Sequence, residues 1–368
     1  MREIKYIPFE YGDHILKVKF LKAFEQFLER KQYILGEETS KFESSWAKYC
    51  QTNYCIGVGN GYDALFLSLK ALNLNKSAEV IVPAHTFAAT TLAVLNAGLT
   101  PVLIDADDKT FNIDATRIEE KITENTNALI AVHLYGNPCE MNRIIHMCKK
   151  YDLFLIEDNA QAQGAKYKGQ STGSFGHISA TSFYPIKNLG AFGDAGAINT
   201  NDEQIYKKLK LLRSYGSPDK HAFEYQGVNS RLDDLQSTFL NIKLEYLDEW
   251  NLMRSEIAHW YFEDLSELEE VQLCQQPEEI LSANHIFPIL VKERDPLRAF
   301  LLSKGIQTLR HYPQPYYLEQ AFSKLGYKSG DFPVTEKICS NEISLPIFPG
   351  LRKEDVKYIC QTISDFYR

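Results

Sequence analysis

Residues 182–196 read SFYPIKNLGAFGDAG and place one lysine, Lys187, between a short apolar run and a glycine-rich loop. Pro185 precedes this lysine, Asn188 follows it, and three glycines come within the next nine residues. Turn-forming and flexible residues of this kind predict a loop at the end of a strand, where functional side chains gather. Taken alone, Lys187 is interpreted equally well as a charged surface residue. The residues elsewhere in the chain decide between a surface lysine and a functional one.

Short apolar runs rich in Ile, Val and Leu recur on both sides of this loop and predict the strands of a buried sheet. Each run is four to eight residues long, and helical patterns alternate with most of them. This alternation predicts βαβ units and a mostly parallel sheet. The predicted strands are residues 54–58, 79–83, 101–105, 127–134, 153–158, 178–183 and 196–200.

The C-terminal part of the chain has a different pattern. A polar loop at residues 216–230 leads to a long helical stretch over about 233–268, whose length suggests a bridge between domains. We therefore predict an α/β protein with a large domain, residues 1–245, and a smaller α+β domain, residues 246–368. Further predicted elements are N-terminal helices at 15–30 and 37–50, a strand at 285–291, a helix at 295–305, a strand ending in His311-Tyr312-Pro313, and a helix at 353–367.

Composition excludes several classes of function. The 368 residues carry a formal net charge of -8 and no block of lysine or arginine, which disfavours nucleic acid and anionic membranes as partners. No apolar run approaches the roughly 18–20 residues that span a bilayer, and the N-terminus lacks the apolar core of a signal peptide. Seven scattered cysteines without a Cys-x-x-Cys pair predict reduced thiols and a cytoplasmic protein.

Chemically useful side chains follow several predicted strands. Ligands of open α/β sheets bind beyond the carboxyl ends of the strands, so these side chains should share one rim. Residues 59–63 (GNGYD) form a helix start, which can bind a phosphate. Asp158 provides a carboxylate that can hold a protonated ring nitrogen. Lys187 provides an amine that can form a Schiff base. Phe87 or His85 could cover a flat ring. Together they match the requirements of pyridoxal 5′-phosphate (PLP).

Other sites are poorly supported. The segment GVGNGY, residues 57–62, has Tyr62 where a dinucleotide fingerprint needs its third glycine. There is no P-loop and no Gly-x-Ser-x-Gly elbow of a hydrolase. The nine histidines are scattered, and His133 and His177 are interpreted as satisfied polar groups, so we predict no metal site.

Three segments together resemble the DegT/DnrJ/EryC1/StrS sugar aminotransferases. They read FLIEDNAQAQGAKYKG (154–169), SFYPIKNLGAFGDAGAI (182–198) and YQGVNSRLDDLQ (225–236). The resemblance extends from about residue 33 to the C-terminus. It implies a PLP-dependent transferase of fold type I, the aspartate aminotransferase fold, whose large domain holds a mostly parallel seven-stranded sheet.

The resemblance also implies roles for individual residues. Lys187 would be the catalytic residue that forms the Schiff base, Asp158 would hold the ring nitrogen, and Gln161 would bind the ring hydroxyl. The phosphate would be held by Gly61, Tyr62, Asp63 and Ser182, with Asn229 reaching the cofactor of the other subunit of a homodimer, and Phe87 would cover the ring. Candidates for contacts with the sugar nucleotide are Tyr33, His85, Tyr184, Arg231, His311 and Tyr312.

The finer resemblance concerns the reaction. Residues 82–90 (VPAHTFAAT) and 305–315 (GIQTLRHYPQP) resemble the branch that aminates C3 of dTDP-3-keto-6-deoxyhexoses with L-glutamate, giving a dTDP-3-amino-3,6-dideoxyhexose and 2-oxoglutarate. Relatives that deoxygenate C3 have histidine in place of Lys187. Amination at C4, of the perosamine or viosamine type, and a non-catalytic regulatory protein of the same fold are the alternatives.

The chain departs from the family pattern at two positions. Tyr62 stands where many members have threonine, which alters the hydroxyl near the phosphate but leaves the backbone donors. Ile186 replaces a smaller residue before the lysine and is expected to reshape the substrate entrance.

Overall fold

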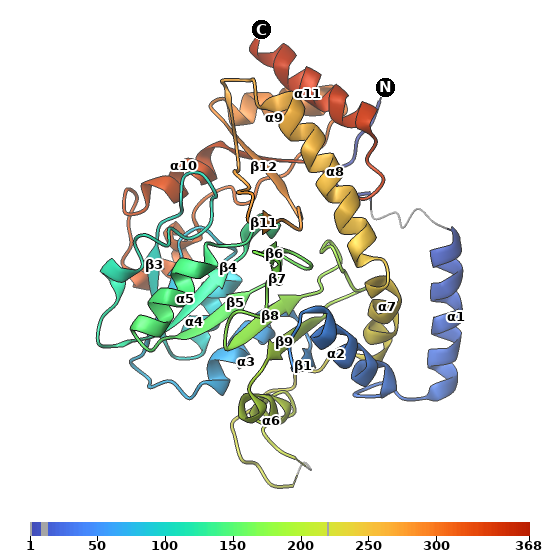
Figure 1. Cartoon of the computed structure of the whole chain (residues 1–368), viewed down its shortest axis with the longest axis vertical. Helices are drawn as coiled ribbons and strands as arrows, with labels where there is room; N and C mark the ends of the chain where they lie inside the picture. Colours follow the sequence, from blue (N-terminus) through green and yellow to red (C-terminus); the bar gives the residue numbers. More distant parts are fainter. Residues whose placement is uncertain (1, 9–13, 219–220) are drawn as a thin grey trace.

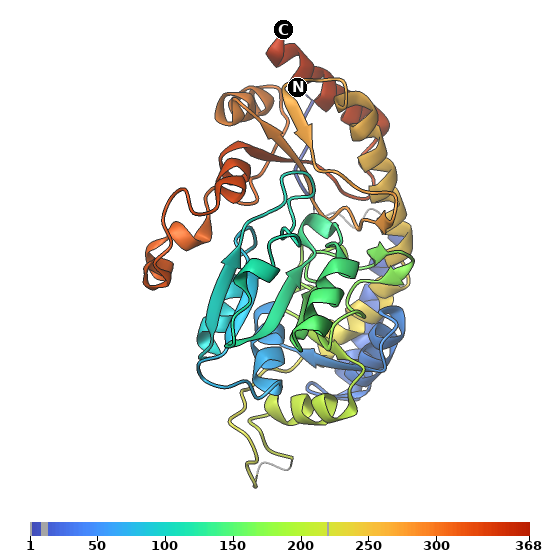
Figure 2. The ribbon, with the colours of Figure 1, turned by 60° about the vertical axis from the view of Figure 1, so that its left-hand side comes forward.

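The structure, a computed structural model, describes residues 2–8, 14–218 and 221–368. A seven-stranded sheet with helices on both faces forms the larger body, and a three-stranded sheet with its own helices forms the smaller one (Figures 1 and 2). The α/β fold predicted from the sequence is confirmed. Asp219 and Lys220, which belong to the predicted polar loop, lie outside the described residues.

The large sheet has the strand order β1-β9-β8-β5-β4-β2-β3. Strand β9 runs antiparallel to both of its neighbours, and the remaining pairs are parallel. All seven predicted strands of this sheet are present, with ends that differ by at most two residues. They are β1 (Tyr54–Val58), β2 (Glu79–Pro83), β3 (Thr100–Ile104), β4 (Thr126–Val132), β5 (Phe154–Asp158), β8 (Ile178–Ser182) and β9 (Gly196–Thr200).

The two faces of this sheet are both buried because apolar residues occupy successive positions of the strands. In β4, Ala128 and Ile130 pack on the side of α3 (Gly61–Ala71) and α4 (Ala89–Asn96). Leu129, between them, packs on the side of α5 (Met141–Lys150). Parallel strands covered on both faces place their carboxyl ends along one accessible edge.

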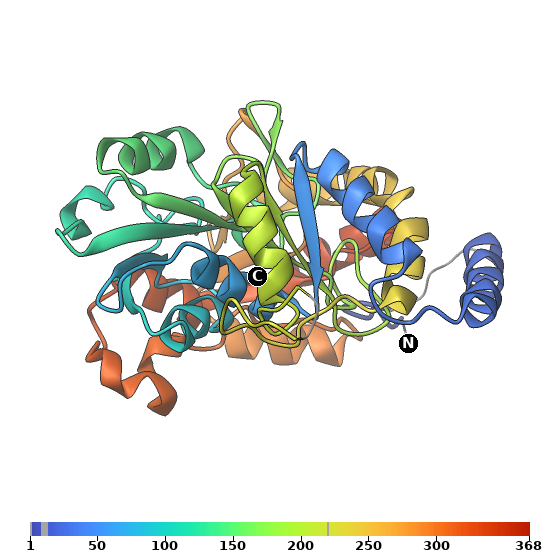
Figure 3. The same ribbon diagram turned by 90° about the horizontal axis from the view of Figure 1, so that it is seen from below.

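Helices cover the rest of the large sheet. The N-terminal helix α1 (His14–Arg30) lies at the margin of the molecule (Figures 1 and 3) and packs on α7 (Asp234–Leu244). Beside them lie α2 (Glu37–Tyr49), which packs on α7 and β1, and α6 (Glu203–Leu212), which packs on α3 and β1.

The single long helix predicted over residues 233–268 is wrong. The chain forms α7 and then α8 (Leu247–Leu265), because Glu245 and Tyr246 make tight hydrogen bonds to the carbonyls of Ile242 and Lys243. This turn buries Leu247 in the core beside β1. Helix α8 then leads into the smaller body (Figure 1), so this part of the predicted helical stretch does connect the two bodies.

The smaller body is built on an antiparallel sheet of order β10-β12-β13, whose strands are β10 (Val271–Leu273), β12 (Phe287–Val291) and β13 (Glu342–Leu345). Its core joins this sheet to α8, α9 (Arg294–Ser303) and α11 (Lys353–Tyr367). The predicted domain boundary after residue 245 falls in the turn between α7 and α8 and stays a prediction.

The predicted strand ending in His311-Tyr312-Pro313 is wrong. Residues 306–312 form isolated bridges, because Ile306 pairs with Ile4 whereas Leu309 pairs with Ser344 of β13. Two different partners divide the segment, and no ladder can form. Elements that were not predicted are β6 (Lys166–Tyr167), β7 (Gln170–Ser171), β10, β11 (Ile280–Leu281), β13, α10 (Pro333–Asn341) and the 3₁₀ turns η1 (Glu119–Lys121), η2 (Leu134–Gly136), η3 (Tyr316–Leu318) and η4 (Gln320–Leu325).

In the described part of the chain, no helix has the length and apolar character needed to cross a bilayer.

A buried carboxylate anchors the loop between β7 and β8. Glu157 accepts hydrogen bonds of 2.7 Å from the amides of Gly173, Phe175 and Gly176. Its fourth donor is His133 Nε2 at 3.0 Å. Since Glu157 precedes Asp158 at the end of β5, this network also fixes the strand end that carries the predicted site.

We expect Glu157→Gln to lower the free energy of unfolding by about 1–3 kcal/mol, because the amide turns a donor toward a buried N–H. Urea unfolding followed by circular dichroism measures this change. Glu120→Gln, at an exposed carboxylate, is the matched control and should change stability little. Equal midpoints for the two variants would contradict the role of Glu157.

Candidate active site

A cavity of about 490 Å³ opens at the carboxyl ends of β4, β5 and β8, beside the N-termini of α3 and α4. It brings together residues from far apart in the sequence. The predicted site residues that line it are Gly61, Tyr62, Phe87, Asp158, Gln161, Ser182, Tyr184, Lys187, His311 and Tyr312.

The start of α3 forms one wall. Asn60 caps this helix, its Oδ1 accepting the amide of Asp63 at 2.8 Å, and the amides of Gly61 and Tyr62 in the first turn have no intrahelical acceptor. A Cβ added at Gly61 would lie 2.5 Å from Cβ of Ser182, so only glycine allows α3 and β8 to approach this closely. The result is a cradle of free N–H groups at a helix N-terminus, which suits an anion.

Two of the residues predicted to bind the phosphate have side chains that form hydrogen bonds with other parts of the protein. The Tyr62 hydroxyl accepts a hydrogen bond from Asn96 at the end of α4, so at this position the backbone amide remains for a ligand. Asp63 lies outside the cavity lining. Its Oδ2 accepts from Ser230 Oγ at 2.6 Å and from Asn60 Nδ2 at 3.1 Å, which ties the start of α3 to the segment around residue 230.

Asp158 provides the carboxylate of the cavity. It is buried at the end of β5 and accepts hydrogen bonds from Thr90 Oγ1 at 2.9 Å and the amide of Ala160 at 3.2 Å. Burial raises the pKa of Asp158, while these hydrogen bonds and the charge of Lys187 act in the opposite direction. A carboxylate in this position suits a cationic ring nitrogen.

Lys187 lies in the same cavity, in the loop after β8. Burial lowers the pKa of Lys187 to about 8, and the charge of Asp158 partly offsets that shift. The loop is tight, because a Cβ at Gly190 would lie 2.3 Å from the carbonyl oxygen of Pro185. An amine with this pKa can both bind and release a proton near neutral pH.

Buried Gln163, which the sequence analysis did not identify, holds this loop in place. Its Oε1 accepts the amide of Leu189 at 2.6 Å, and its Nε2 donates to the carbonyls of Ser182 and Leu189. Gln163 lies in the segment 154–169, one of the three that resemble the sugar aminotransferases, and this position was the sequence signal that could have identified it.

Gln161 and Tyr312 meet at the cavity wall. Gln161 Nε2 donates to the Tyr312 hydroxyl at 3.2 Å, and its Oε1 accepts the amide of Tyr135 at 2.6 Å. The ring of Phe87 lies 5.6 Å from that of Tyr312 and remains 58% exposed, so the two aromatic rings stand together at the cavity. His85 lies outside the lining: it is buried, and its Nε2 is 2.8 Å from the Tyr135 hydroxyl.

His311 is held by a buried carboxyl group that sequence reasoning missed. Glu342 accepts the amide of His311 at 2.7 Å and a hydrogen bond from Ser344 Oγ, which in turn lies 2.7 Å from His311 Nδ1. Burial raises the pKa of Glu342 to about 7 and lowers that of His311 to about 4. At neutral pH, His311 therefore meets the cavity as an uncharged imidazole.

Besides Asp63 and His85, three further predicted residues lie away from the cavity lining. Tyr33 and Asn229 are exposed, and Arg231 is half-buried. Within the chain described here, none of them joins the other site residues.

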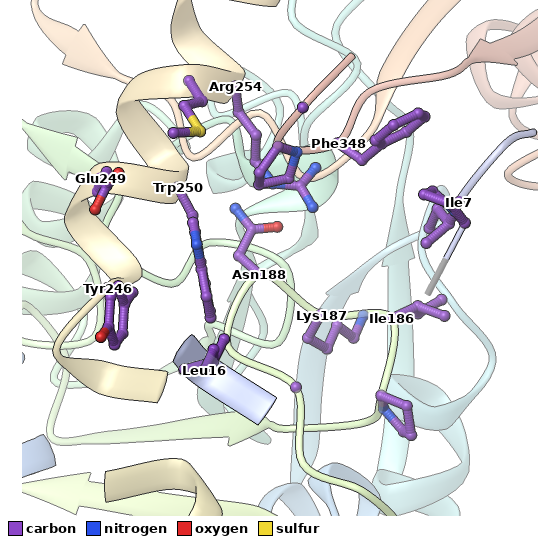
Figure 4. Close-up of a pocket in the computed structure, with 16 residues that line it drawn as sticks. Ile7, Leu16, Ile186, Lys187, Asn188, Tyr246, Glu249, Trp250, Arg254 and Phe348 are labelled. Atoms are coloured by element: carbon purple, nitrogen blue, oxygen red, sulfur yellow. The ribbon is translucent and has the colours of Figure 1, made fainter. Parts of the chain in front are cut away.

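A second cavity, of about 320 Å³, borders the Lys187 loop (Figure 4). Its walls come from α8, the N-terminal segment and the loop around Phe348, and it shares Ile186 and Lys187 with the first cavity. Arg254 in this wall donates to the carbonyl of Ile347 at 2.7 Å. The Lys187 loop is thus a thin partition with space along two sides.

The residues of the first cavity fit PLP. A cradle that a Cβ would fill suits the phosphate, buried Asp158 suits the ring nitrogen, and Lys187 suits the aldehyde. In the part of the chain that the structure describes, no group of three metal-ligating side chains gathers.

Comparison with known proteins agrees with this geometry. The model of the DegT/DnrJ/EryC1/StrS aminotransferase family matches residues 14–364. A dTDP-3-amino-3,6-dideoxy-alpha-D-galactopyranose transaminase of Aneurinibacillus thermoaerophilus is 45% identical over 94% of this chain and 94% of its own length. A pleiotropic regulatory protein of Geobacillus stearothermophilus is 40% identical over 96% of this chain and 95% of its own.

Among solved structures, S. venezuelae DesV in complex with a ketimine intermediate superimposes with a TM-score of 0.97. The two are 36% identical, and the match covers 100% of this chain and 99% of DesV. The resemblance seen in the sequence is confirmed, and the chain belongs to the DegT/DnrJ/EryC1/StrS aminotransferase family.

Proposed function

We propose that this chain, a PLP-dependent aminotransferase, transfers the amino group of L-glutamate to a dTDP-linked 3-keto-6-deoxyhexose. The products are a dTDP-3-amino-3,6-dideoxyhexose and 2-oxoglutarate. The observation that carries the proposal is the convergence of Lys187, Asp158 and the open start of α3 on one cavity. The 45% identity with a transaminase named for a 3-amino sugar supports the choice of C3.

PLP would supply an electron sink and a carbonyl that amines can exchange on. The phosphate would be held by the amides of Gly61 and Tyr62 and by Ser182, since these line the cradle between α3 and β8. Asp158 would hold the ring nitrogen protonated. Gln161 would bind beside the ring hydroxyl, and Phe87 would cover the ring.

Lys187 would carry out the proton transfers of the reaction. With a pKa of about 8, its amine can take the proton from Cα of glutamate and later return one to the amino acid or sugar carbon. Asp158, the nearby opposite charge, keeps the ammonium form accessible, while burial keeps the neutral form accessible. Of the candidates for contacts to the sugar nucleotide, Tyr184, His311 and Tyr312 line the cavity, and we propose the contacts for these three. Tyr33, His85 and Arg231 lie outside the lining.

A regulatory protein without turnover is the alternative from another class, and a relative with such a name favours it. Binding alone, however, does not need an amine whose pKa is lowered to about 8 beside a buried carboxylate. Amination at C4 remains the alternative within the same chemistry.

We further propose a homodimer in the cytoplasm. Helix α1 buries Leu16 and Phe27 against the protein but exposes an apolar stripe made of Ile15, Val18, Leu21, Phe24 and Leu28. Five exposed apolar side chains on one side of a helix are typical of an interface between copies. Exposed Asn229 would then reach the cofactor phosphate of the partner.

All seven cysteines are buried and form no disulfide, which supports the reducing compartment that we propose, the cytoplasm.

The proposed reaction is tested by product analysis with purified protein, L-glutamate and dTDP-linked 3-keto and 4-keto sugars. We expect amination at C3, and no product with Lys187→Ala, because that variant lacks the proton carrier. Amination of the 4-keto sugar alone would establish the C4 alternative. If neither sugar is aminated although PLP is bound, the proposed function is wrong.

Gly61→Ala should weaken PLP binding by at least about tenfold, because the added Cβ would lie 2.5 Å from Ser182 Cβ and displace the cradle. Absorbance titration of the apoprotein with PLP measures the dissociation constant. The double variant Gly61→Ala/Ser182→Gly removes the closest contact, that with Ser182 Cβ, but leaves Ser182 Cα 3.1 Å away, so it should recover part of the affinity lost in Gly61→Ala. Unchanged binding in Gly61→Ala would show that the phosphate lies elsewhere.

The proposed dimer is tested by Val18→Asp/Leu21→Asp, which places two charges in the apolar stripe of α1. Light scattering after gel filtration should give a dimer for the wild type and a monomer for this variant, with activity lost in parallel. Lys149→Asp, at an exposed position of α5 away from this stripe, is the control and should remain dimeric. A dimeric double variant would exclude this face as the interface.

A further inference from the structure

His285 is a cavity residue that the proposed mechanism does not yet use. It lies just before β12, is 4% exposed and lines the same cavity as Lys187. Its Nδ1 lies 3.1 Å from Oδ1 of Asn188, the residue that follows Lys187 in the chain. The sequence predicted a strand at this position, and a histidine opening an apolar run carried no functional signal of its own.

A chain of side-chain amides fixes the protonation of this ring. Asn251 Nδ2 donates to the carbonyl of Gln163 at 2.8 Å, so Asn251 Oδ1 is the atom that faces Asn188. Asn188 Nδ2 donates to that Oδ1 at 2.8 Å and to the carbonyl of Ala283 at 2.7 Å. Asn188 therefore turns its oxygen toward His285, and because an amide oxygen only accepts, His285 Nδ1 carries the hydrogen.

His285 Nε2 is consequently an unprotonated acceptor. Among the described residues it has no hydrogen-bond partner, although it is buried. Burial, together with the charges of Lys187, Arg254 and His311, holds the pKa of His285 well below its usual range, so the ring stays neutral. A buried acceptor without a partner is costly, which indicates that a donor occupies this place in the working enzyme.

The Lys187 amine is the complementary group. It lines the same cavity, it contributes to lowering the pKa of His285, and no hydrogen bond joins its Nζ to another described residue. The loop that carries Lys187 is also hydrogen-bonded to the imidazole of His285 through Asn188, the residue after Lys187. A half-buried donor and a buried acceptor, neither with a hydrogen-bond partner among the described residues, thus line one cavity.

We propose that His285 is a positioning residue for Lys187: its unprotonated Nε2 accepts a hydrogen bond from the Lys187 amine whenever that amine is released from the cofactor. The bond aims the amine at the carbon whose proton it carries. The proposal rests on the proton-transfer role of Lys187 given above, but not on the identity of the sugar.

Three variants test it: His285→Phe, which removes the acceptor, His285→Gln, which offers an oxygen acceptor instead, and His146→Phe at an exposed control histidine of α5. The rate of the half-reaction with L-glutamate is measured by stopped-flow absorbance, with and without deuterium at Cα. We expect His285→Phe to slow it at least about tenfold and to increase the isotope effect. His285→Gln should recover much of the rate, and His146→Phe should match the wild type.

A purely structural role would give a different result. The melting temperature and the PLP dissociation constant should remain near the wild-type values in His285→Phe. If the rate falls only in proportion to lost stability or lost cofactor, or if His285→Gln is as slow as His285→Phe, the positioning role is wrong.

The cofactor-free protein supplies a readout that does not depend on turnover. Nitrogen-15 spectra of histidine-labelled apoprotein should show His285 protonated at Nδ1 and unprotonated at Nε2 at neutral pH. A hydrogen on Nε2, or a cationic ring, would overturn the proposal. A wild type that reacts with glutamate but aminates no keto sugar would overturn the sugar assignment alone, so the two failures are distinguishable.

Discussion

The burial of two opposite charges in one cavity is the constraint on which the rest of the site depends. Removing Lys187 and Asp158 from water shifts both pKa values toward the neutral forms, and each charge partly restores the other. Neither side chain would have these properties at the surface. The packing of α3 against β8, and of α4 against α3 and β2, forms the walls of the cavity and is therefore part of the chemistry and not only of the fold.

Holding the lysine loop requires contributions from several parts of the chain. Gln163 fastens the loop to β8, Gly190 lets it turn against Pro185, and Asn188 links it to α8 and to the approach to β12. These bonds join the large sheet to the smaller body around a single amine. A loop fixed in this way can present Lys187 in one orientation even though a second cavity borders it.

Local sequence patterns were sufficient for much of this. The strand runs, the glycine cradle, Asp158 and Lys187 follow from residue types at strand ends, and the positions of these strands are confirmed. The break between α7 and α8 could not be predicted, because it depends on burying Leu247 in a distant core. His285 and Glu342 were equally inaccessible, since each gains its meaning from partners about 97 and 31 residues away, Asn188 and His311.

The link between Asp63 and Ser230 has a consequence for assembly. Asp63 belongs to the first turn of the helix that cradles the phosphate, and Ser230 is the neighbour of Asn229, the residue offered to a second copy of the chain. One hydrogen bond of 2.6 Å therefore connects the helix that borders one active site to the segment that, in the proposed homodimer, would complete the other. In the proposed homodimer, the binding of cofactor and the association of subunits would be thermodynamically linked through this bond.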